Sequence, residues 1–155
     1  MSLSESPTAS EHEIRFLAWQ EKHRRSDQLT EKMDTLEQLL SAESGQSLVF
    51  ARTKRGADRI GKSLVRSGFS AAVIHGDRSQ SQRNKALNGF QEGHYQVLVA
   101  TDIASRGLHV DDVAHVINYD VPKMAEDFVH RVGRTGRAGS PGQASTLVAG
   151  PNSSN

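Results

Sequence analysis

Three arginines spaced three residues apart are the residues in this sequence best suited to chemistry on a phosphate. Arg131, Arg134 and Arg137 would share one helix face, but Gly133 and Gly136 predict that the helix ends here, since glycine is a poor interior helix residue. A compact loop would then present Arg134 and Arg137, whose planar, always charged guanidinium groups match phosphate oxygens. Two such groups suit a phosphate whose charge grows during transfer. Taken alone, the pattern fits a solvated basic loop equally well.

The composition excludes several classes of protein. The chain has 155 residues, a formal net charge of +1 and no cysteine. It therefore has no disulfide framework and no thiolate metal site, and any basic footprint for nucleic acid must be local. No apolar run reaches the roughly 18 residues of a membrane span, and the first 13 residues lack the apolar region of a signal peptide. We expect a cytoplasmic protein.

Apolar periodicity predicts an α/β fold. Strands alternating with helices favour a mainly parallel sheet with helices on both faces. Strands are expected at 14–19, 47–51, 70–74, 96–100, 113–119 and 143–148. Helices are expected from 27 or 30 to 42, from 54 to about 67, from 79 to 91 and from 124 to 132. We expect a disordered lead at 1–12, one domain at 13–149 and a frayed tail at 150–155.

Local signals fix where the helices begin and end. Thr53 can cap the helix that follows it, and Ser79 followed by Gln82 is a capping-box pattern. Gly68 and Gly93 stand where a left-handed residue would end a helix.

The loops that follow the strands are the expected binding loops, because ligands of parallel sheets bind at the carboxyl ends of the strands. They are residues 52–54, 75–77, 101–109 and 120–122. After His75, Gly76 and Asp77, a helix amino terminus favours an anion; Gly76 would let a sugar-phosphate backbone approach, and Arg83 could pair with a phosphate. The alternative is an ordinary capped turn with a solvated arginine.

The third of these loops combines a hydroxyl, a carboxylate and a glycine. The Thr101 hydroxyl at a strand end can donate to a phosphate, and Gly107 permits a tight loop. Asp102 cannot bind a phosphate, so we expect it to pair with Arg131 or Arg106 and to hold two loops in register. A plain strand-to-loop turn is the alternative.

The sequence also lacks several features that would assign other chemistry. It has no G-x-x-x-x-G-K-[ST] loop and no acidic run after a strand that could hold magnesium. Gly61-Lys62-Ser63 carries the last three letters of that loop but falls inside an expected helix, so it is interpreted as a chance match. The histidines His12, His23, His94 and His115 show no metal-ligand spacing. The aromatic residues fall inside expected elements, so a nucleic acid would be held by its backbone.

Taken together, four stretches resemble four ordered motifs of the second, carboxyl-terminal RecA-like domain of DEAD-box RNA helicases. The resemblance covers residues 14–147 and implies a three-layer α/β/α sandwich. The stretches are 48–54 for motif IV, 75–83 for the Q-x-x-R element, 99–107 for motif V and 130–137 for motif VI. The sequences at 53–58 and 79–83 resemble those of bacterial RhlE-type members.

The resemblance also implies roles for individual residues. Arg134 and Arg137 would be arginine fingers on the γ-phosphate, with Gly107 and His109 also near ATP. The residues expected along the RNA backbone are Thr53, Gly76, Asp77, Arg83 and Thr101. Those expected to couple the two sides are Asp102, Arg106, His130 and Arg131. His109 stands where the family usually has an aspartate that meets the ribose, so we expect a weaker contact there.

The implied function is half of an ATP-dependent RNA helicase. ATP with Mg²⁺ would be held mainly by the amino-terminal RecA-like domain of the same protein, and RNA would lie between the two domains, so this half alone should be inactive. The alternatives are a non-catalytic RNA- or protein-binding module derived from a helicase and a helicase acting on DNA. No membrane partner is expected, and ribosome-assembly or RNA-decay partners stay unspecified.

Overall fold

The structure is a computed structural model that describes residues 12–19, 25–105, 110, 113–121, 130–131, 134 and 142–149. The expected lead before residue 12, the tail after 149 and most of the expected helix at 124–132 lie outside these residues. Residues 130 and 131 at the end of that stretch are helical.

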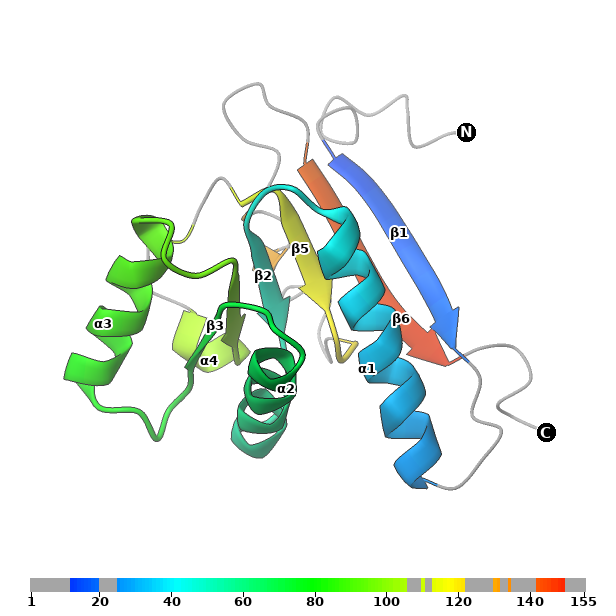
Figure 1. The fold of residues 1–155 in the computed structure, drawn as a ribbon, viewed down its shortest axis with the longest axis horizontal. Helices are drawn as coiled ribbons and strands as arrows, with labels where there is room; N and C mark the ends of the chain where they lie inside the picture. The colour runs from blue at the N-terminus through cyan, green and yellow to red at the C-terminus, as the bar shows by residue number, and fades with distance from the viewer. Residues whose placement is uncertain are drawn as a thin grey trace.

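The centre of the fold is a six-stranded sheet in which all adjacent strands are parallel (Figure 1). Its order is β1 (His12–Trp19), β6 (Gly142–Ala149), β5 (His115–Asn118), β2 (Ser47–Phe50), β4 (Val97–Ala100) and β3 (Ala71–Ile74). Six strands were expected near these positions, and the mainly parallel α/β fold is confirmed.

The strand register brings four strand ends to one edge of the sheet. Phe50 of β2 aligns with Ala100 of β4 and Asn118 of β5, and Ala100 aligns with Ile74 of β3. The loops that follow these four strands therefore start side by side.

Helices cover both faces of the sheet. α1 (Arg25–Ala42) and α2 (Lys54–Arg66) lie in front of the strands in Figure 1 and share one core cluster with them. α3 (Gln80–Gln91) and α4 (Asp102–Ser105) pack on the other face in a second cluster. A loop was expected at α4. The four-residue helix is too short to show periodicity, and it is fixed by Ala104, which is 1% exposed in the second cluster. No helix among the described residues is long and apolar enough to cross a membrane.

The expected helix-end signals are confirmed. Thr53 is the N-cap of α2, and its side chain accepts a hydrogen bond from the Gly56 backbone N–H at 3.0 Å. Ser79 and Gln82 form the reciprocal capping box at the start of α3. Beyond α2 and α3, Gly68 and Gly93 adopt φ of +97° and +85°, in the left-handed region that side chains disfavour.

Gly61 has a packing role, which explains the glycine of the chance match to a phosphate-binding loop. It lies inside α2, and a Cβ added there would collide with Cγ2 of Val73 on β3. Because valine is stiff at χ1, its methyl group cannot rotate away cheaply. The absence of a side chain thus sets how closely α2 approaches β3.

We predict that Gly61→Ala lowers the free energy of unfolding by about 1 kcal/mol, because overpacking outweighs the gain in helix propensity. Chemical denaturation measures the change, with Lys62→Ala as the control because Lys62 is exposed on the same helix. An unchanged or increased stability for Gly61→Ala would contradict the close approach.

Candidate functional site

Residues that follow four adjacent strands gather at the carboxyl edge of the sheet. Thr53 and Lys54 follow β2, His75 to Asp77 follow β3, Thr101 and Asp102 follow β4, and Asp120 follows β5. Two polar networks hold this edge, one around Arg131 and one around His75.

The first network surrounds a buried guanidinium. Arg131 is 2% exposed. Its Nε and Nη2 donate to Oδ1 and Oδ2 of Asp102, both at 2.6 Å. Its Nη1 donates to Oδ1 of Asn118 at 3.0 Å and to the backbone oxygen of Asp120 at 2.8 Å. The pairing of Asp102 with Arg131, one of the two alternatives expected, is confirmed.

The Phe50 ring completes the Arg131 cluster, which we define as Arg131, Asp102, Asn118, Asp120 and Phe50. The Arg131 guanidinium lies over the Phe50 ring at 4.8 Å, a favourable cation–π contact. Asn118 Nδ2 donates to Thr146 Oγ1 at 2.9 Å. One side chain thereby joins residues of α4, β5 and β2, and reaches β6 through Asn118.

Asp120 connects this edge to α1. Its Oδ1 accepts a hydrogen bond from Lys32 Nζ at 3.0 Å, and its Oδ2 accepts one from the Arg52 backbone N–H at 2.7 Å. Lys32 also lies over the Tyr119 ring at 4.5 Å. Burial, with the nearby Asp120 charge, raises the pKa of Tyr119 to about 12, so its hydroxyl stays neutral at physiological pH. The Asp120 carboxylate therefore links the start of the loop after β2 to Lys32 on α1.

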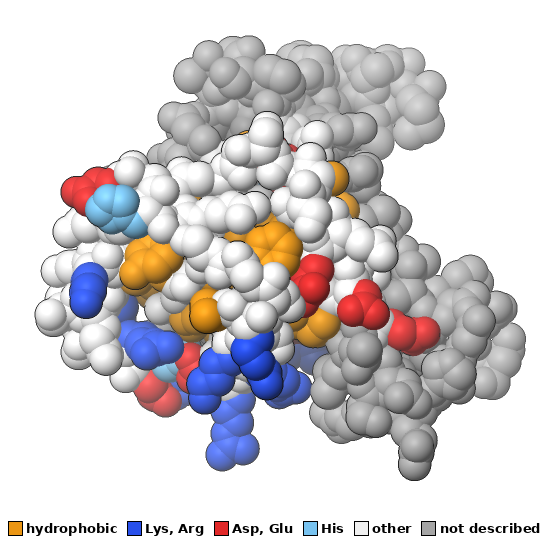
Figure 2. Space-filling model, in the orientation of Figure 1, with side chains coloured by type: hydrophobic (Ala, Val, Ile, Leu, Met, Phe, Trp, Pro, Cys, Tyr) orange, Lys and Arg blue, Asp and Glu red, His pale blue; other side chains and the backbone are white. Residues whose placement is uncertain are grey.

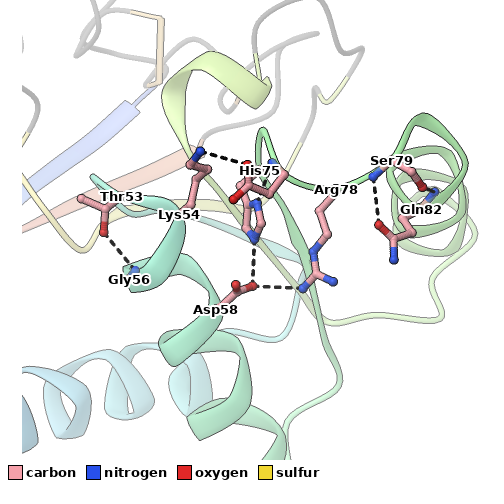
Figure 3. Close-up of polar contacts among 9 residues, drawn as sticks. Thr53, Lys54, Gly56, Asp58, His75, Arg78, Ser79 and Gln82 are labelled. Carbon is pink, nitrogen blue, oxygen red and sulfur yellow. Dashed lines mark hydrogen bonds and ion pairs between the residues drawn. The ribbon is translucent and has the colours of Figure 1, made fainter.

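The second network centres on His75, which is 4% exposed (Figure 3). The Asp77 backbone N–H donates to His75 Nδ1 at 3.1 Å, so the proton of the neutral ring lies on Nε2. That Nε2 is 2.9 Å from Asp58 Oδ1, which also accepts a hydrogen bond from Arg78 Nη2 at 3.0 Å. Asp58 on α2 thus fixes the turn at Gly76 and Asp77.

Lys54 and Asp77 form an exposed ion pair beside this turn. Lys54 Nζ is 2.9 Å from Asp77 Oδ1, and the two side chains are 53% and 69% exposed. The hydrogen bond from Lys54 and its charge hold the pKa of Asp77 below the usual value of 3.8. Lys54 thus binds the exposed end of the turn after β3.

Four of the five residues expected along an RNA backbone follow the adjacent strands β2, β4 and β3, and the fifth, Arg83, lies on α3. Thr53, Gly76 and Asp77 are exposed. Thr101 is 7% exposed, and its backbone N–H donates to the Ile74 oxygen at 3.4 Å, beside the β3 end. Arg83, in the first turns of α3, is half-buried. The amino terminus of α3 was expected to attract an anion, but the capping box already occupies its Gln82 N–H.

Arg134 is the one expected nucleotide contact that the structure describes. It is half-buried, its backbone N–H donates to the Arg131 oxygen at 3.2 Å, and its own oxygen accepts from the Val113 N–H at 3.1 Å. His130 beside it is exposed. The expected site residues Arg106, Gly107, His109 and Arg137 lie outside the described residues.

Sequence reasoning gave no role to Asn118 or Asp58, and it placed Asp120 in an expected binding loop without its partners. Asn118 at the end of strand His115–Asn118, directly after Val116 and Ile117, was a usable signal, because a buried amide needs partners. The role of Asp58 had no local signal, since its partners come from another loop. His115 has a packing role: it is 1% exposed, with Nε2 2.7 Å from Ser145 Oγ.

Comparison with known proteins gives consistent matches. The profile of the helicase conserved C-terminal domain matches residues 31–139. The DEAD-box ATP-dependent RNA helicase CshA of Bacillus subtilis is 50% identical over 118 residues, which are 76% of this chain and 24% of CshA. The chain therefore spans about a quarter of the length of this curated relative.

Solved structures of DEAD-box proteins share the fold. The C-terminal domain of the DEAD-box protein Dbp5 superimposes with a TM-score of 0.76 at 30% identity, over 93% of this chain and 79% of that chain. A DEAD box protein from Methanococcus jannaschii gives a TM-score of 0.80 at 38% identity, over 90% and 36% of the two chains. The resemblance to RhlE-type members stays a prediction.

We predict that Asp102→Asn lowers the free energy of unfolding by about 3 kcal/mol, because it leaves the buried Arg131 without its counter-charge. Asp77→Asn is the matched control, since an exposed ion pair such as that with Lys54 contributes far less than a buried one. Both are measured by chemical denaturation. Equal losses for the two variants would contradict the anchoring role of the Arg131 cluster.

A second prediction concerns the pKa of Asp77. Lys54 lowers the Asp77 pKa in the folded protein. The ion pair therefore stabilises the fold at pH values above the pKa of Asp77 in the unfolded chain, and this stabilisation is lost as the pH falls through the lowered pKa of the folded protein. Lys54→Met should raise the Asp77 pKa towards its usual value, as followed by carboxyl NMR titration. Lys62→Met on the same helix should leave it unchanged. A constant Asp77 pKa in Lys54→Met would show that the pair does not persist in solution.

Proposed function

The chain belongs to the helicase conserved C-terminal domain family of DEAD-box RNA helicases, and we propose that it acts as the second RecA-like domain of an ATP-dependent RNA helicase. The observation that supports the proposal most is the hydrogen bond between the backbones of Arg134, a candidate phosphate ligand, and the buried Arg131. The sequence contains no G-x-x-x-x-G-K-[ST] loop that would itself hold the phosphates.

In this proposal, ATP with Mg²⁺ is a substrate held mainly by another RecA-like domain, the amino-terminal one of the same protein. In this proposal, the protein ligands of the magnesium ion also come from that domain. Closure of the two domains would bring Arg134 and Arg137 to the γ-phosphate, with Gly107 and His109 near the rest of the nucleotide.

The two arginines would act as electrostatic stabilisers. In the transition state, negative charge spreads over the equatorial oxygens of the phosphoryl group and develops towards the leaving group, and a positioned guanidinium lowers the energy of that state. Such an arginine finger contributes about 10³–10⁵ in rate, or ~4–7 kcal/mol of barrier. A finger needs a rigid base, which the backbone hydrogen bond between Arg134 and Arg131 supplies.

On the RNA side, the proposal assigns backbone contacts to Thr53, Gly76, Asp77, Arg83 and Thr101. Thr53 Oγ1 accepts from Gly56, so its hydroxyl hydrogen can still donate to a phosphate. Gly76 is exposed, and even a Cβ added there would come no closer to a neighbour than 3.8 Å, from Lys54 Cδ, so a sugar-phosphate chain has room.

The Arg131 cluster would couple the two sides. Asp102 directly follows Thr101 on the RNA side, and Arg131 lies three residues before Arg134 on the ATP side. Because the Asp102–Arg131 pair is bidentate, a displacement of one loop is resisted by the other. We propose that Arg106 and His130 extend this coupling.

The test of this function is ATP hydrolysis in the presence of RNA. The chain alone should show no RNA-stimulated hydrolysis, and adding a separately produced RecA-like domain that carries a G-x-x-x-x-G-K-[ST] loop should restore it. Robust turnover by the chain alone would refute the proposal.

In the restored system, Arg137→Ala should lower the rate of hydrolysis by about 10³-fold or more while leaving ATP binding within about twofold. Arg59→Ala is the matched control, since Arg59 is exposed on α2 and has no assigned role. An equal loss of binding and hydrolysis in Arg137→Ala would count against the finger role.

A further inference from the structure

An open groove runs along β3, and none of its described lining residues is one of those proposed to contact ATP or RNA. It has a volume of about 670 Å³ and lies between α2 and α3. Its floor is formed by Ala71, Ala72 and Val73 of β3, together with Tyr95. Neither the Arg131 cluster nor the expected RNA contacts account for it.

The β3 backbone is unpaired on the side of this groove in the described part of the chain. β3 ends the strand order and pairs with β4 alone. The Ser70 and Ile74 oxygens accept from the Val97 and Thr101 N–H groups, at 3.0 and 3.4 Å. Since alternate residues of a parallel strand bond to the same neighbour, the N–H and C=O groups of Ala71 and Val73 point outward.

The side chains along the groove are unusually exposed for this sheet. All four residues of β2, β4 and β5 are buried, whereas Ala71, Ala72 and Val73 are only half-buried. Val65 at the rim is 57% exposed, one of two large hydrophobic residues so exposed among those described. An apolar sheet edge of this kind is either a liability or a docking site for another strand.

The rim of the groove is positively charged. It carries Lys62 and Arg66 from α2, Lys85 from α3 and Arg78 from the connecting loop. The acidic residue in the lining, Asp58, already binds His75 and Arg78. In Figure 2, Lys and Arg side chains gather beside hydrophobic ones on the side that carries α2 and α3. The charge that complements this rim is negative.

We propose that the groove binds an extended acidic peptide segment of a partner protein, which adds to the sheet as a strand beside β3. Ala71 and Val73 supply main-chain hydrogen bonds, small apolar side chains of the peptide meet the alanine and valine floor, and flanking carboxylates meet Lys62 and Lys85. This interaction is independent of ATP hydrolysis.

A peptide fits these features better than RNA. Away from the loops that would hold its backbone, single-stranded RNA gains affinity from aromatic stacking, and Tyr95 is the one aromatic residue in the described lining of the groove. Outward N–H and C=O groups at alternate residues complement the backbone of a strand. The Lys and Arg rim alone would suit either ligand, so the main-chain edge decides between them.

The binding test uses the fluorescein-labelled peptide Glu-Glu-Val-Thr-Val-Thr-Glu-Glu and the full chain. We expect saturable binding with a Kd below about 1 mM and at least about tenfold weaker binding of the same peptide with Lys in place of Glu. Hydrogen exchange followed by NMR should show new protection at the Ala71 and Val73 amides.

Two variants separate the main chain from the charges. Ala71→Pro removes an outward N–H without breaking a bond to β4, which an edge strand tolerates, and it should weaken binding about tenfold. Lys62→Glu combined with Lys85→Glu should do the same. Arg59→Glu is a charge-reversal control on α2, outside the groove, and should bind normally. Unchanged exchange at the β4 amides verifies that each variant is folded.

Several results would overturn the proposal. One is the absence of saturable binding of the acidic peptide below about 1 mM; another is equal binding of the acidic and basic peptides. Normal peptide binding by Ala71→Pro would exclude strand addition. Displacement of the peptide by a short oligouridylate, with RNA binding lost in Lys62→Glu/Lys85→Glu but kept in Ala71→Pro, would assign the groove to nucleic acid instead.

Discussion

The constraint on which the rest of this structure depends is the burial of one guanidinium group. Arg131 is 2% exposed and keeps its charge. A buried charge is tolerated only when hydrogen-bond acceptors surround it. Asp102, Asn118 and the Asp120 backbone supply those acceptors from α4, β5 and the loop after β5. Because each acceptor must be in place at once, the loops at the carboxyl edge have one arrangement.

Two further polar contacts hold the loops beside the Arg131 cluster. Asp120 holds the start of the loop after β2 through the Arg52 N–H, and Asp58 holds the turn after β3 through His75. These contacts hold the loop backbones that carry the exposed Lys54 and Asp77 side chains. Such preorganisation would lower the conformational cost of binding the phosphate backbone proposed as the ligand.

Features set by local chemistry could be predicted from the sequence. Strand 47–51, the Thr53 cap and the Ser79–Gln82 capping box depend on neighbouring residues, and all three are present. A pairing of Asp102 with Arg131 or Arg106 was expected because a carboxylate among these loops needs a cation, and Arg131 is the partner that the structure shows. The order of the strands, α4 and the role of Asp58 were not, because they are decided by packing between distant segments. Gly61 shows the same limit, since its reason lies in Val73.

The central claim is that the Arg131 cluster presents Arg134 to a nucleotide held by another domain. A crystal structure of the closed complex with ADP–aluminium fluoride and RNA tests it most directly. The account predicts the Arg134 guanidinium within about 3 Å of the γ-phosphate analogue, with the Asp102–Arg131 pair intact. An Arg134 side chain turned into its own domain, or a closed complex in which that pair is broken, would contradict it.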